Sequence, residues 1–489
     1  MKRNFNGATI DALSLTFVQI IITLISMVIY KLLAVTFSLE EYGIYSSAML
    51  VSSTVTSITI LGLTDAINFF YTKETDKERG KRFTYTIFAL QFVIGIAAAV
   101  ILVLFRTPIA KYFDNSTVAL YIPYIALLPL ITNLANMLHV VFIAAKKAKV
   151  LAIRSLIIYA LKILLVILTC WLIRDIKMVL IITLVLDMGN VVYMFLYCRH
   201  SIFPINLRKA DFSLTKEILK YSVPMSAYIF TNALSKNMDK MVIGYLSDAE
   251  GLAIYSIASK ELPFHILTSS FLTVLVPYIT RYVGNKDYKN ASDSFSKCLQ
   301  ISYIVTIMIS AGAIACSRDL MLILYDSKYL GGLGVFVLYI VVDMMKFANV
   351  SLVFSITGKT KELLCYSGSA LILNLILNIF FYNKFGMIGP AVSTVLITFI
   401  LSCIMMIRSA KLLECKTAKL VNLKQLLFII LECVVCSLIA VLARNRFFNG
   451  LPLLFSFAFT YLIYVIPLLA LNGKKILTLL KEINALKMS

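Results

Sequence analysis

The chain of 489 residues is 60% hydrophobic and only 15% charged, which excludes a soluble globular protein, because the surface of one needs more polar cover. Its 46 Lys and Arg exceed its 25 Asp and Glu, so the net charge is +21. In a soluble chain this excess would indicate nucleic-acid binding. In a membrane protein, basic cytoplasmic loops explain it, and we predict no nucleic-acid partner.

Fourteen segments of the sequence are apolar enough to span a bilayer, which takes roughly 20 residues per helix. In chain order they cover residues 10–34, 41–70, 84–105, 118–144, 151–173, 177–198, 217–245, 253–280, 293–315, 331–356, 361–382, 387–408, 426–443 and 451–471. The loops between them are short, so we predict no water-soluble domain. The first segment is longer than the apolar stretch of a cleaved signal peptide, and we expect it to remain as a membrane helix.

The distribution of basic residues predicts the topology of these segments. With the N-terminus in the cytoplasm, the cytoplasmic loops and their flanks hold 31 Lys and Arg, whereas the outer loops hold 9. Positive charge is concentrated on the cytoplasmic side of membrane proteins. We therefore expect fourteen spans with both termini in the cytoplasm.

Two short sequence echoes indicate an internal repeat. Gly43–Ser46 returns as Ala253–Ser256 at an offset of 210 residues, and each copy follows a short acidic break. Lys147–Lys149 opens one apolar segment and Lys359–Lys361 opens another, at an offset of 212. Two nearly equal offsets predict one membrane unit used twice, as in many transporters.

The repeat predicts an all-α polytopic membrane protein. We expect an N-terminal six-helix lobe over 1–205, a C-terminal six-helix lobe over 206–410, and an extra helix pair with a cytoplasmic tail over 411–489. Because each lobe has an even number of spans, the two lobes share one orientation in the membrane. They would surround a central cavity.

Polar residues inside the apolar segments are the candidate substrate-binding residues. A charged side chain at mid-bilayer costs at least ~2.5–3.5 kcal/mol, so such residues usually face a partner or a wet cavity. Helical spacing places several of them on common stripes of their segments. The predicted substrate-binding residues are Lys162, Lys236, Asp239, Asp343, Lys346, Asn374 and Asn378.

The intramembrane charges leave two interpretations open. Asp239 follows Lys236 by three residues and Asp343 precedes Lys346 by three, so each pair could simply neutralise itself. Lys162 has no acidic neighbour one turn away, which makes it the better candidate for binding an anionic substrate. The repeat aligns Lys162 with Asn374, so the two lobes would be charged unevenly.

Cysteine and histidine patterns indicate no redox or metal chemistry. The nine cysteines lie in or beside apolar segments without a pair of outer cysteines that would suggest a disulfide. Cys433 and Cys436 are spaced C-x-x-C, which we interpret as two small apolar residues one turn apart on a helix. The three histidines are far apart in the sequence. We predict no metal site and no cofactor.

Several motifs are distributed over nearly the whole chain. They are Leu39–Tyr45 followed by Leu61–Leu63, Asn237–Lys240 leading to Ala253–Ala258, Val276–Ile279, and Phe385–Ala391. With these motifs the chain resembles the Wzx-like oligosaccharide flippases of the multidrug/oligosaccharidyl-lipid/polysaccharide (MOP) exporter superfamily. The sixth segment departs from that pattern, because it lacks the glycine motif that opens the twelfth.

The resemblance implies a non-enzymatic flippase of the bacterial cytoplasmic membrane. Such a protein moves an undecaprenyl-pyrophosphate-linked oligosaccharide between leaflets by alternating access, with the lipid tail left among membrane lipids. In that picture Lys162, Lys236 and Lys346 neutralise the anionic head, while Asp239 and Asp343 sense protons or cations. A proton or a sodium ion is the candidate coupling ion. Polysaccharide polymerases and glycosyltransferases are candidate partners.

Other functions remain open at this point. A lipid II flippase or a drug or metabolite exporter of the same superfamily fits the composition and repeat equally well. A membrane-embedded polysaccharide polymerase or glycosyltransferase is a more remote alternative, because such enzymes usually need a large outer loop. The longest outer loops here cover only about 106–117 and 316–330. A purely structural membrane protein does not explain buried charges in both lobes.

Overall fold

The computed structural model describes residues 2–73, 76–264, 275–276, 278–347, 351–448 and 450–486. Within these ranges every regular element is a helix, which confirms the predicted all-α class. The chain forms two compact units, Met1–Ser256 and Ile257–Ser489. These two units follow from packing contacts and do not test the division into repeated lobes. The lobes 1–205, 206–410 and 411–489 therefore stay a prediction.

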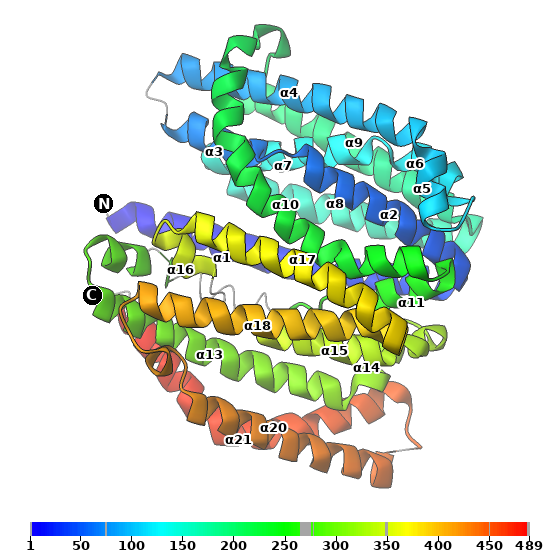
Figure 1. Cartoon of the computed structure of the whole chain (residues 1–489), viewed down its shortest axis with the longest axis vertical. Coiled ribbons are helices and arrows are strands. Elements are labelled where there is room, and N and C mark those ends of the chain that lie inside the picture. The colour runs from blue at the N-terminus through cyan, green and yellow to red at the C-terminus, as the bar shows by residue number, and fades with distance from the viewer. Residues whose placement is uncertain are drawn as a thin grey trace. The chain divides into compact units, whose positions relative to one another are not determined.

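The first unit consists of long helices joined by short connections (Figure 1). Polar caps begin several of them. Ser38 forms a capping box with Glu41 at the start of α2, and Asp76 and Asp175 cap α4 and α9. The elements are α1 Lys2–Thr36, α2 Leu39–Thr59, α3 Leu63–Lys73, α4 Lys77–Leu104, α5 Arg106–Tyr112, α6 Val118–Ile125, α7 Leu128–Ala144, α8 Ala148–Leu168, η1 Thr169–Ile173, α9 Ile176–Ser201, η2 Leu207–Lys209, η3 Phe212–Leu214, α10 Thr215–Leu246 and α11 Ala249–Ala258.

The second unit begins within the last turn of α11 and ends with two long helices. Its α17 and α18 form a hairpin, because only Gly386 and Met387 separate them. The elements are α13 Tyr288–Ala315, α14 Ser317–Leu324, η4 Ser327–Gly332, α15 Leu333–Met345, α16 Ser351–Ile356, α17 Thr360–Phe385, α18 Ile388–Leu412, α19 Thr417–Leu420, α20 Leu423–Ala443, η5 Arg444–Phe448 and α21 Leu453–Leu486.

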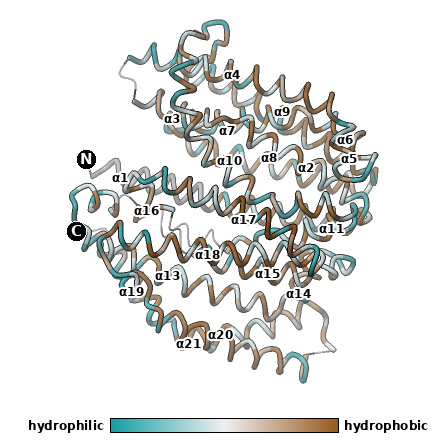
Figure 2. The backbone as a smooth tube through the Cα atoms, viewed as in Figure 1, coloured by the Kyte–Doolittle hydropathy of each residue, from teal (hydrophilic) through white to brown (hydrophobic). Residues whose placement is uncertain are grey.

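The helices have the length and composition of membrane spans. In the described part of the chain, 12 helices are long and apolar enough to cross a bilayer. Figure 2 shows that most of the long helices are hydrophobic over much of their length, with hydrophilic residues gathered toward their ends. The predicted seventh segment is α10, and the eighth begins with α11 and continues into 265–274 and 277, which lie outside the described residues. The chain is therefore a multi-pass membrane protein.

Three predicted segments besides the eighth are interrupted within the described residues. The segment 41–70 breaks after α2, where Leu61 and Gly62 have φ of 42° and 66°. Gly62 is needed there, since a Cβ atom would collide with the carbonyl oxygen of Ser222 on α10. The segment 118–144 divides into α6 and α7, with a proline in the first turn of α7. The segment 331–356 divides into α15 and α16.

Both sequence echoes occupy equivalent positions in the structure. Gly43 is the fifth residue of α2 and Ala253 is the fifth residue of α11. In the same way α8 follows Lys147 as its N-cap and α17 follows Lys359. Counted from these starts, Lys162 and Asn374 are both the fifteenth residue of their helices, so the structure supports the predicted correspondence.

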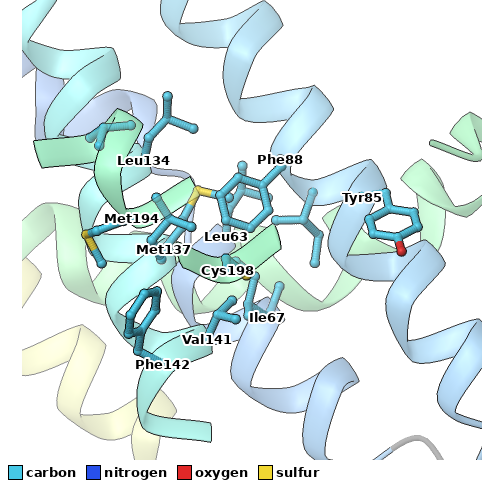
Figure 3. Close-up of a cluster of buried hydrophobic side chains, with 14 of the residues drawn as sticks. Leu63, Ile67, Tyr85, Phe88, Leu134, Met137, Val141, Phe142, Met194 and Cys198 are labelled. Atoms are coloured by element: carbon cyan, nitrogen blue, oxygen red, sulfur yellow. The ribbon is translucent and has the colours of Figure 1, made fainter. Parts of the chain in front are cut away.

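A cluster of buried apolar side chains holds the first unit together (Figure 3). Leu63 and Ile67 of α3 lie with Phe88 of α4, Met137 of α7 and Met194 of α9. Aromatic stacking extends the cluster, because the rings of Phe70 and Phe83 lie 4.2 Å apart. The membrane helices α7 and α9 are thereby held beside each other, which positions the polar groups described below.

The last two helices pack on α13 through both apolar and polar contacts. The Tyr464 hydroxyl donates to the carbonyl oxygen of Met308 at 2.6 Å. Cys433 and Cys436 are buried free thiols of α20, in agreement with the packing interpretation of their spacing. The carboxylate of Glu432 accepts a hydrogen bond from Asn472 of α21 at 2.8 Å, which gives this charge a structural partner.

Candidate functional site

A polar pocket lies among the membrane helices of the first unit. Its volume is about 200 Å³, and side chains of α7, α8 and α9 surround it. Polar groups outnumber apolar ones, although all three helices belong to membrane spans. The lining residues are Ile131, Thr132, Ala135, Asn136, His139, Arg154, Ser155, Ile158, Tyr159, Asp187 and Asn190.

Packing on neighbouring helices orients the α8 side of this pocket. Ala152 of α8 packs against Val18 and Ile22 of α1. Tyr159, which lines the pocket, packs against the same cluster. The Arg154 guanidinium donates to the Ser155 hydroxyl at 2.9 Å and contacts the sulfur of Met194 on α9. The cation is thus held at the pocket within the membrane-spanning part of α8.

Lys162 lies two turns beyond Arg154 on the same helix and is partly buried. Its ammonium group acts electrostatically on Asp187 of α9, which lines the pocket. Neither side chain forms a direct ion pair with any residue that the structure describes, so the attraction acts over a gap. The charge of Lys162 is therefore partly offset by Asp187 at a distance, without a direct ion pair.

Three tyrosines lie near Asp187 or near one another. Tyr159 of α8 lies in the pocket, and Tyr30 of α1 and Tyr45 of α2 are close enough to interact electrostatically with it or with Asp187. Their hydroxyl groups are donors and acceptors that suit phosphate or sugar oxygens. Four helices therefore contribute polar groups around Lys162 and Asp187.

Sequence reasoning missed several members of this pocket. Arg154 stands near the start of its segment, so the charge count assigns it to the cytoplasmic flank. His139 is one of three widely separated histidines, whose spacing indicates no metal site. The sequence gives Asp187 no role, because its relation to Lys162 crosses from one helix to another. A cation inside the hydropathy segment was the signal that could have identified Arg154.

The predicted residues Asp343 and Lys346 form an ion cluster in the second unit. The Lys346 ammonium lies 3.1 Å from Asp343 and 2.8 Å from Glu261. Asp343 is fully buried and also accepts the backbone N–H of Leu262 at 2.9 Å. This geometry agrees with the interpretation in which Asp343 and Lys346 neutralise each other. A role of the pair in substrate binding stays a prediction.

This cluster lies where two helices are interrupted. Helix α11 ends at Ala258, and residues 260–262 are not helical. Asp343 satisfies the backbone of Leu262 in that interruption, and α15 itself ends two residues after Asp343. Interrupted helices are where transporters expose backbone groups to ions and substrates.

The predicted pair Lys236 and Asp239 does not share one environment. Lys236 is exposed on α10. Asp239 is buried and accepts a hydrogen bond from the hydroxyl of Tyr255 at 3.0 Å. Tyr255 belongs to the echoed tetrapeptide of α11, so this repeat element also anchors a buried acid.

Asn374 and Asn378 are buried in the α17–α18 hairpin. The Asn378 amide donates to the Asn374 side-chain oxygen at 3.2 Å, and the Asn374 amide donates to Ser393 and Thr394 at 3.3 and 3.4 Å. These bonds join the two helices. The oxygen of Asn378 is buried without a protein partner, so the network has one unused acceptor within the described residues.

The two polar sites lie in a multi-pass helical membrane protein. A family model described as polysaccharide biosynthesis protein matches residues 16–332. The chain belongs to this family. A search among curated proteins gives no match.

Solved structures share the fold at low sequence identity. The lipid II flippase MurJ, in an inward closed conformation, is 15% identical with a TM-score of 0.72, over 94% of this chain and 99% of that chain. An inward-facing multidrug resistance MATE transporter of the MOP superfamily is 12% identical with a TM-score of 0.63, over 80% of this chain and 95% of that chain. The MATE multidrug transporter DinF-BH is 16% identical with a TM-score of 0.59, over 83% of this chain and 96% of that chain.

Proposed function

We propose that this protein is a flippase for a lipid-linked oligosaccharide with an anionic undecaprenyl-pyrophosphate head. It would act in the bacterial cytoplasmic membrane, with both termini in the cytoplasm, and serve surface polysaccharide export. Membership of the polysaccharide biosynthesis family supports a sugar-containing substrate. The observation that carries the proposal is the pocket of the first unit, which Arg154 lines, together with Lys162, which lies two turns further along the same membrane helix and acts on the lining residue Asp187.

Arg154 and Lys162 both suit the phosphate oxygens of such a head. Lysine meets a phosphate oxygen as a compact charge, and the guanidinium of arginine presents a planar fork of donors. Among the described residues Lys162 forms no direct ion pair, so none has to break before it binds a phosphate. Asp187 limits the excess of positive charge while no substrate is bound. The head would enter the pocket while the lipid tail stays in the bilayer.

Transport would proceed by alternating access, driven by a proton or a sodium ion. Asp239 and Asp343 are the candidate coupling acids, because both are buried carboxylates. Asp239 accepts a hydrogen bond from Tyr255 of α11, and Asp343 accepts one from the backbone of Leu262, beyond the end of α11. The proposal includes no chemical step on the sugar. The structural neighbours named above are a flippase and multidrug transporters, which favours transport over a polymerase or glycosyltransferase.

Depletion of the protein in its host tests the proposal. We expect lipid-linked oligosaccharide to accumulate in the inner leaflet, where it stays inaccessible to a membrane-impermeant sugar-cleaving enzyme added to spheroplasts. Expression of the protein should restore access to the enzyme. Unchanged access after depletion would contradict the proposal.

A second candidate is a lipid II flippase, favoured by the match to MurJ over nearly the whole chain. At 15% identity this match concerns the fold alone. Complementation separates the candidates, because a lipid II flippase rescues a strain that lacks its own, whereas an oligosaccharide flippase restores only surface polysaccharide. A drug exporter would instead change resistance to toxic cations.

A further inference from the structure

A hollow lies at the open end of the α17–α18 hairpin in the second unit. The two helices run antiparallel beside each other, so the start of α17 meets the end of α18 (Figure 1). The hollow has a volume of about 520 Å³. It is lined by Lys361, Glu362, Cys365, Tyr366, Arg408 and Lys411.

The lining carries an excess of positive charge. Glu362 accepts two hydrogen bonds from Arg408, at 2.8 and 2.9 Å, which fixes the guanidinium and offsets its charge. Lys361 and Lys411 are exposed, and neither forms an ion pair within the described ranges. Three cations against one carboxylate leave two positive charges to be balanced by a ligand.

Apolar stripes lead away from both lysines along the hairpin. On α18, Ile407, Ile404 and Ile400 follow Lys411 at helical spacing and are 49%, 43% and 38% exposed. On α17, Ile372 and Ile376 are 64% and 57% exposed further along the face that begins with Lys361 and Cys365. Spacings of three and four residues keep each stripe on one side of its helix. The hollow therefore joins a basic end to two exposed apolar faces.

We propose that this hollow binds the phosphate headgroup of an anionic phospholipid, whose acyl chains lie along the exposed faces of α17 and α18. Basic clusters at the end of membrane helices attract anionic lipids. A free phosphate ion would use the lysines but not the apolar stripes, so the combination favours a lipid. The Glu362–Arg408 pair keeps one wall of the hollow in place, and Tyr366 provides a hydroxyl to the headgroup.

Cys365 lines the hollow and provides an attachment site for a fluorescent probe. We would label it with a fluorophore in the full chain with Cys403 and Cys415 changed to Ser, since all other cysteines are buried. The labelled protein is reconstituted in phosphatidylcholine vesicles that contain a minor fraction of either brominated phosphatidylglycerol or brominated phosphatidylcholine. We expect the anionic brominated lipid to quench the fluorophore at lower mole fractions than the zwitterionic one.

The lysines should account for this preference. Each is expected to contribute about fivefold to the apparent affinity, so Lys361→Gln with Lys411→Gln should weaken it by about 25-fold. Lys384→Gln, at the opposite end of α17, is the matched control and should leave the preference unchanged. Equal quenching by both lipids, or an undiminished preference in the double variant, would overturn the proposal. Loss of the preference on adding inorganic phosphate at matched ionic strength would assign the hollow to free phosphate instead.

Discussion

Lys162 and Asp187 provide a test that separates charge neutralisation from substrate binding. We expect Lys162→Ala to abolish surface polysaccharide, because the anionic head loses a cation that lies beyond Arg154 on the same helix and acts on the pocket residue Asp187. The same variant leaves Asp187 in a membrane helix without the positive charge that acts on it. Lys162→Arg, which keeps the charge, should retain part of the export.

The stability cost follows from the placement of the two side chains. Unit charges 4 Å apart attract by about 4 kcal/mol at an effective dielectric constant of about 20, and this pair is farther apart than a direct ion pair. Both side chains are partly exposed, which screens the attraction further. We therefore expect Lys162→Ala to destabilise the protein by about 1–2 kcal/mol.

A double variant completes the test. Lys162→Ala with Asp187→Asn removes both charges, so it should recover most of the lost stability but none of the export. Stability is measured as thermal unfolding of the detergent-solubilised protein, and export as surface polymer normalised to the amount of protein in the membrane. If the double variant exports polymer like the wild type, Lys162 serves only to balance Asp187, and the proposed substrate contact is refuted.

Two further predictions concern the second unit. Asp343→Ala should destabilise the protein by about 2–4 kcal/mol, because the buried N–H of Leu262 loses its acceptor. Asp343→Asn keeps an acceptor and should cost less. Equal unfolding temperatures for the two variants would contradict this expectation. Gly312→Ala should cost about 1–3 kcal/mol, because the new Cβ atom would lie 2.5 Å from the ring of Tyr464. Thermal unfolding tests this as well, and wild-type stability would show that the helix contact is looser than described.

Local patterns in the sequence predicted the fold class well. A run of about 20 apolar residues has few alternatives to a membrane helix, since its backbone groups must be satisfied internally. The repeat offset also predicted that Lys162 and Asn374 stand at the same position of α8 and α17. Interruptions of the membrane helices were harder to predict. The interruption at Gly62 depends on the close approach of α10, which no local sequence pattern indicates.

The sequence by itself determined that this is a polytopic helical membrane protein with a repeated unit and charges within its spans. Hydropathy and charge asymmetry act along the chain, so they can be read from it. Only the tertiary structure decided which groups interact across helices: Lys162 with Asp187 of α9, and Asp343 with the backbone of Leu262. Electrostatic partners depend on distance in space, and helix packing brings together residues that the sequence separates by 25 to 81 positions.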